Sequence, residues 1–106
     1  MRTLFAGLLT LTVLAAPARA ETPEETAFGL GQFTGAATFC KVPKAKVQQV
    51  AAALLEASGI DASQGGPAMS RFTAGVTDGV QSMQKPDAAS CADVTAAFDE
   101  AYTKIQ

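Results

Sequence analysis

Two cysteines are the strongest constraint on the fold of this 106-residue chain. Cys40 lies in Phe39-Cys40-Lys41-Val42-Pro43, which ends one predicted helix and begins the next, and Cys91 starts the last predicted helix. Two cysteines in an exported chain most economically form one disulfide. A redox-active pair is the alternative, but the Cys-x-x-Cys spacing typical of it is absent. We therefore expect a Cys40–Cys91 disulfide that closes a loop of about 50 residues and contributes about 4 kcal/mol in the chain-entropy model.

The first twenty residues predict export. Arg2 supplies a positive start, Leu4 to Ala16 is an apolar run, and Ala18-Arg19-Ala20 matches a small-x-small cleavage site. The apolar run is shorter than the roughly 20 residues that cross a bilayer. A buried N-terminal helix is the alternative. We expect residues 1–20 to be a signal peptide cut after Ala20, and residues 21–106 to form a single helical domain, periplasmic or secreted, without an integral membrane segment.

Four helices are predicted from capping signals. The first begins at Thr22-Pro23-Glu24-Glu25, which combines a capping box with proline at the first helical position. Pro43 can open the second helix, which ends at Gly59, Pro67 can start the third, and the fourth follows the capping residue Ser90. The alternation typical of β-strands is absent. The predicted fold class is therefore all-α: a small four-helix domain closed by one disulfide.

Each predicted helix has one apolar face whose residues recur at spacings of three and four, the period of an α-helix. We expect these faces to form the core. They comprise Leu30, Phe33, Ala37 and Cys40; Val47, Val50, Ala51, Leu54 and Ser58; Met69, Phe72, Val76, Val80 and Met83; and Val94, Phe98, Ala101, Tyr102 and Ile105.

Glycines inside two predicted helices indicate close packing. Gly29, Gly31 and Gly35 lie in the first helix, where each costs up to about 1 kcal/mol relative to alanine. They would admit a close neighbour; a ligand loop is the alternative, but no phosphate-loop or dinucleotide pattern accompanies them. In the third helix Gly75 and Gly79 form a Gly-x-x-x-Gly pair, which would seat a crossing helix or a partner helix. We take Gly75, Asp78 and Gly79 as the candidate partner-binding residues.

The composition limits the chemistry. The chain has no histidine, which excludes Ser-His-Asp and Cys-His catalysis and histidine-ligated zinc. The acidic residues near the C-terminus follow no calcium-loop pattern. A formal net charge of −2 argues against nucleic acid as a partner. We expect a protein that is not an enzyme and has no metal or cofactor, and whose partner is a protein of the cell envelope.

Two segments leave alternatives open. Lys41, Lys44 and Lys46 form either a patch for an acidic partner or an ordinary solvated helical face. The segment from Ile60 to Ala68, which contains Gly65-Gly66-Pro67, is either a plain connection or a recognition loop.

The segment Phe72-Thr73-Ala74-Gly75-Val76-Thr77-Asp78-Gly79, with Cys91 twelve residues further on, resembles the aromatic-x-x-Gly-Val-x-Asp-Gly and distal-cysteine pattern of the Rap/Tai immunity proteins of type VI secretion. That resemblance implies a small exported helical protein that neutralises a toxic effector. The adjacent cysteine usual in the pattern is absent here, so no inhibitory residue is transferred. In layout alone, an exported helical domain with one long-range disulfide is also similar to acid-stress chaperones of the HdeA type.

Three functions follow from these observations. The first is a protein-interaction module of the cell envelope, including an immunity-type inhibitor of an effector. The alternatives are an acid-activated periplasmic stress chaperone and a module that binds a small ligand or a metal ion.

Overall fold

The computed structural model describes residues 22–106, apart from the side chain of Gln64. Within this range the secondary structure is helical: α2 spans Pro23–Phe39, α3 Lys44–Ala57, α4 Gly66–Ser82 and α5 Cys91–Lys104, and a short 3₁₀ turn, η1, spans Ala62–Gln64. The all-α, four-helix prediction is confirmed. The predicted signal peptide at residues 1–20 lies outside the described residues and stays a prediction. No helix within residues 22–106 is both long and apolar enough to cross a membrane.

The N-terminal caps form as their sequences predict. The Thr22 side chain accepts a hydrogen bond from the Glu25 backbone N–H at 3.1 Å, and the Glu25 carboxylate accepts one from the Thr22 N–H at 3.0 Å. Ser90 Oγ likewise accepts from the Asp93 N–H at 3.1 Å. Each cap satisfies backbone donors that the first helical turn leaves without intrahelical partners.

Helices α2 and α3 end in the same hydrogen-bond pattern, the Schellman motif. In α3 the Gly59 N–H donates to the Glu56 carbonyl and the Ile60 N–H to the Leu55 carbonyl. In α2 the corresponding donors are Lys41 and Val42. The residue after the C-cap must adopt a left-handed conformation, and φ is +78° at Gly59 and +64° at Lys41. Lys41 thus occupies a position that normally favours glycine.

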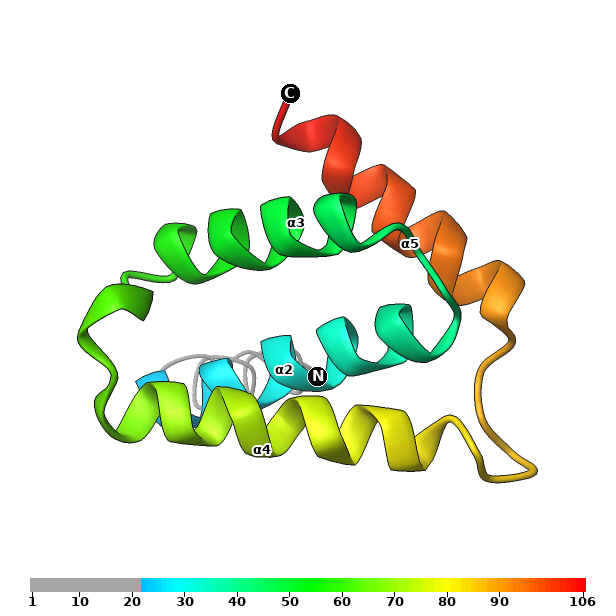
Figure 1. Ribbon diagram of the computed structural model, residues 1–106, viewed down its shortest axis with the longest axis horizontal. Coiled ribbons are helices and arrows are strands. Elements are labelled where there is room, and N and C mark those ends of the chain that lie inside the picture. The colour runs from blue at the N-terminus through cyan, green and yellow to red at the C-terminus, as the bar shows by residue number, and fades with distance from the viewer. Residues whose placement is uncertain (1–21) are drawn as a thin grey trace, which may run out of the picture.

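Helices α2 and α4 lie side by side and run in the same direction (Figure 1). Their contact uses two Gly-x-x-x-Gly pairs in register, since Gly31 and Gly35 face the backbone of Phe72 to Val76, and Gly75 and Gly79 face that of Phe28 and Gln32. A Cβ atom at any of the four glycines would come closer than 3.0 Å to a backbone atom of the other helix. The pair therefore packs backbone against backbone. Connecting two parallel helices needs a return path, which α3 supplies.

The core consists of two clusters, each of which contains one buried residue of α2. The first contains Ala37, Val42, Val47, Val50 and Phe98. Phe98 is fully buried, and the centre of its ring lies 4.9 Å from the centre of the Phe33 ring. The second contains Ala27, Leu55 and Ile60, with Met69 and Phe72 of α4 packed against it. The first cluster holds α5 to α2 and α3, and the second holds the start of α4 to the end of α3.

The predicted disulfide is confirmed. Cys40 and Cys91 are bonded, with their Cα atoms 5.4 Å apart and 51 residues apart in sequence. Because α4 runs parallel to α2, it returns the chain to the end of α2 at which Cys40 lies (Figure 1). The connection that follows α4 can therefore place the start of α5 beside Cys40.

The predicted apolar faces of α2, α3 and α5 pack in or against the core, except at Ser58, which is exposed, whereas that of α4 does so only at its start. Val76, Val80 and Met83 are only partly buried, and the buried residues of α4 are Gly75 and Gly79. The prediction that this face forms a core stripe holds only for Met69 and Phe72, which contact the second cluster. The physical reason is that α4 contacts α2 through Gly75 and Gly79. Its larger side chains therefore lie beside the contact rather than within it.

Candidate functional site

The predicted partner-binding residues lie at the α2–α4 contact. Gly75 and Gly79 are buried beneath α2, and Asp78 Oδ2 accepts a hydrogen bond of 2.7 Å from Gln32 Nε2. The Arg71 guanidinium lies 4.4 Å from the centre of the Phe28 ring, again across α2 and α4. Of the two alternatives for the glycine pair, the crossing helix of the same chain is present. A partner reaches the two glycines only if α2 and α4 separate, and partner binding by Gly75, Asp78 and Gly79 stays a prediction.

A first candidate surface is the C-terminal part of the apolar face of α4, which we call the α4 stripe: Val76, Val80 and Met83. These residues continue the helical face of Met69 and Phe72, which packs against the second core cluster. The α4 stripe belongs to neither core cluster. Within residues 22–106, α4 forms its one extensive helix–helix interface with α2. The α4 stripe is therefore a partly exposed apolar surface outside both core clusters.

A second candidate surface is a cavity of about 340 Å³ at the turn between α2 and α3, which we call the slot. It is lined by Thr38, Val42, Lys44, Val47 and Gln48. Two valines and the aliphatic parts of the other side chains make its walls mainly apolar. Its volume lies within the range of about 300–1,000 Å³ that is usual for small-molecule sites. The slot is thus large enough for a ligand, and its chemistry favours an apolar one.

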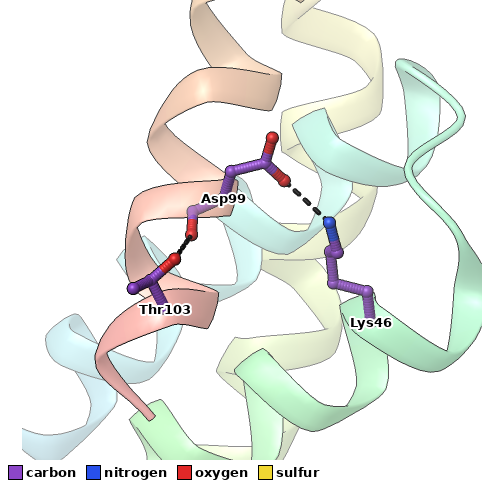
Figure 2. Close-up of polar contacts among 3 residues, drawn as sticks. All are labelled: Lys46, Asp99 and Thr103. Carbon is purple, nitrogen blue, oxygen red and sulfur yellow. Dashed lines mark hydrogen bonds and ion pairs between the residues drawn. The ribbon is translucent and has the colours of Figure 1, made fainter. Parts of the chain in front are cut away.

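The three lysines near the slot have different environments. Lys46 Nζ lies 2.8 Å from Asp99 Oδ1 and 5.0 Å from the centre of the Tyr102 ring, so it joins α3 to α5 (Figure 2). The Thr103 hydroxyl donates to the Asp99 carbonyl oxygen at 3.0 Å (Figure 2). Lys41 and Lys44 are exposed, and neither side chain has a partner in the described part of the chain. Lys46 is therefore structural, and the lysine patch reduces to two unpaired cations.

A third feature is a more open cavity of about 470 Å³ at the end of α3. Its lining includes Leu55, Glu56, Ile60 and Asp61. The Asp61 carboxylate accepts hydrogen bonds from the Ser63 N–H at 3.0 Å and the Ser63 hydroxyl at 2.7 Å, which orders the start of η1. The segment predicted as a loop thus contains a 3₁₀ turn, and α4 begins within it at Gly66. Asp61 shapes this turn rather than facing a ligand.

Across residues 22–106 no three acidic or cysteine side chains gather closely enough to hold a metal ion. No protein-family model, curated protein or solved structure matches this chain. The function is therefore inferred from the α4 stripe and the slot. Sequence patterns missed both surfaces: helical periodicity assigned the α4 stripe to the core, and the slot forms between residues whose proximity depends on how α2 meets α3. The one sequence signal for the slot was Lys41, which follows the C-cap of α2 at a position where glycine is usual.

Proposed function

We propose that this protein is an exported protein-interaction module of the cell envelope that binds an apolar helical face of a partner protein. The observation that carries the proposal is the α4 stripe, whose three apolar residues are only partly buried and belong to neither core cluster. Val76, Val80 and Met83 recur at spacings of four and three, the arrangement by which helices pack into apolar grooves. The resemblance to Rap/Tai proteins suggests a role for such a module: inhibition of a toxic effector.

The rigid α2–α4 pair supports the same function. Four glycines allow the two backbones to pack in direct contact, so the α4 stripe is presented on a preorganised surface. Preorganisation reduces the entropy lost on association, which increases affinity for a given contact area. A partner helix that covers Val80 and its neighbours would remove apolar surface from water at about 25 cal/mol per Å².

The proposal is tested by affinity capture from periplasmic and secreted extracts with three oxidised baits. The natural chain and Thr77→Asp should retain one stoichiometric partner, because Thr77 is exposed and lies off the α4 stripe. Val80→Asp should lose it, because a carboxylate would be buried in the apolar contact without a counterion. Both substitutions add the same charge to the same helix, so their comparison isolates the α4 stripe. Circular dichroism checks that each bait is folded.

Other outcomes contradict this proposal. Capture of the same partner by Val80→Asp would show that binding uses another surface. Many weakly held clients, with suppression of client aggregation at about pH 3, would favour the acid-activated stress chaperone instead.

A further inference from the structure

The slot, unlike the α4 stripe, is a cavity, and all of its lining residues lie between Thr38 and Gln48. Val42 follows the left-handed residue of the α2 Schellman motif, and Val47 lies one turn into α3. Both valines are almost fully buried, at 8% and 7% exposure, so they form its floor and inner wall. Thr38, Lys44 and Gln48 are exposed and form its rim. This arrangement separates an apolar interior from a polar rim.

The charge at the rim is positive and unpaired. Lys44 lines the slot, and Lys41 adjoins Val42, which also lines it. Neither lysine has an ion-pair partner within residues 22–106. No acidic residue lies in the first turn of α3 to balance Lys44. An apolar cavity with one unpaired cation at its rim, and a second beside a lining residue in the sequence, is complementary to a molecule with an alkyl chain and one negative head group.

Both lysines occupy positions that oppose local stability. Lys41 adopts φ of +64°, which costs a residue with a Cβ atom about 1–2 kcal/mol. Lys44 is the first residue of α3, where a positive charge is unfavourable to the helix dipole. Residues held in unfavourable conformations often mark functional sites. A bound anion would offset the unfavourable charge of Lys44 at the start of α3.

We propose that the slot binds the alkyl chain of a free medium-chain carboxylate, such as a fatty acid, with the carboxylate held at the rim by Lys41 and Lys44. This site is separate from the α4 stripe and does not depend on the partner-binding function. Contact of the alkyl chain with the apolar lining as a whole, including the aliphatic parts of the rim side chains, supplies most of the affinity, and the lysines set the orientation and the charge preference.

The proposal is tested by isothermal titration of the oxidised chain with octanoate and decanoate, each below its micellar concentration. The expected result is saturable binding of one carboxylate per chain, with affinity rising by up to about fourfold for each added methylene. Decyltrimethylammonium, which has the same chain and a positive head group, is the matched probe and should bind much more weakly. Equal binding of the two head groups, or no saturable binding, would overturn the proposal.

Substitutions locate the site. Gln48→Trp places an indole at the rim of the slot and should abolish decanoate binding, whereas Gln49→Trp, at an exposed residue outside the lining, should not. Lys44→Gln should weaken decanoate binding by about two- to fivefold, the range expected for an exposed ion pair, and Lys85→Gln should leave it unchanged. Binding that is equally affected by Gln49→Trp, or insensitive to Gln48→Trp, would place the ligand elsewhere.

The variant Lys41→Gly distinguishes a ligand-binding role of Lys41 from a structural one. Glycine relieves the left-handed conformation, so the melting temperature should rise while decanoate affinity falls by about two- to fivefold. A purely structural role for Lys41 predicts no loss of affinity. Unchanged decanoate binding by this more stable variant would remove Lys41 from the site.

Discussion

The same substitution, glycine to alanine, should have opposite effects at two positions of α2. At Gly29 a Cβ atom would have no heavy atom within 4 Å, whereas at Gly35 it would come closer than 3.0 Å to the Val76 carbonyl oxygen. Gly29→Ala is therefore expected to stabilise the protein by about 1 kcal/mol, the difference in helix propensity between the two residues. The two sites lie in one helix, so each is the control for the other.

The magnitude at Gly35 follows from what the methyl group meets. Overpacking typically costs about 1–3 kcal/mol, and the cost falls when a neighbouring side chain can rotate away. Here the obstacles are backbone atoms of α4, which move only if the two helices separate. Taking the upper end of that range and subtracting the gain of about 1 kcal/mol in helix propensity, we expect Gly35→Ala to destabilise the protein by about 2 kcal/mol.

The assay is thermal or urea unfolding followed by circular dichroism. For a domain of this size, 1 kcal/mol shifts the melting temperature by about 4–8 °C. Gly29→Ala should therefore melt about 4–8 °C higher than the natural chain, and Gly35→Ala about 8–16 °C lower. If Gly35→Ala is as stable as Gly29→Ala, the backbone contact between α2 and α4 does not exist as described.

Three further outcomes are expected. Replacing Cys40 and Cys91 by serine should lower the free energy of unfolding by about 4 kcal/mol in the chain-entropy model for a separation of 51 residues, and urea unfolding that matches the oxidised chain would contradict this. Phe98→Ala should cost about 3–5 kcal/mol, because the ring is fully buried between α2, α3 and α5, and a loss below about 1 kcal/mol in the same assay would argue against that packing. Lys41→Gly should stabilise the chain by about 1 kcal/mol, measured by the same unfolding curves, and destabilisation would mean that its side chain makes contacts worth more than the conformational relief.

The predictable part of the fold was local. The capping box of Thr22 and Glu25 closes because its two partners are three residues apart, whatever the rest of the chain does. The end of α3 at Gly59 follows equally from one residue that readily adopts a left-handed conformation. The disulfide was predictable by elimination, because Cys40 has only one possible partner in the chain.

The candidate sites were less predictable, and α4 shows why. Helical periodicity identifies a face of Met69, Phe72, Val76 and Val80, but it does not tell which neighbour lies against that face. Helix α4 can turn either this face or its glycines, Gly75 and Gly79, toward α2. Two backbones in direct contact gain many close van der Waals contacts, and α2 carries a matching pair of glycines in register. The packing therefore uses the small residues and leaves the larger ones only partly buried.

The sequence by itself determined where the helices begin and end to within a few residues, that they number four between residues 22 and 106, and that one disulfide joins the first of them to the last. These properties depend on hydrogen bonds and steric limits among residues close in the chain, and on there being only two cysteines. The tertiary structure alone decided that α2 and α4 pack in parallel through glycines, that the α4 stripe is only partly buried, and that the slot forms beside Lys44. Each of these depends on which surfaces meet among several of similar apolar character, and local sequence patterns do not rank such choices.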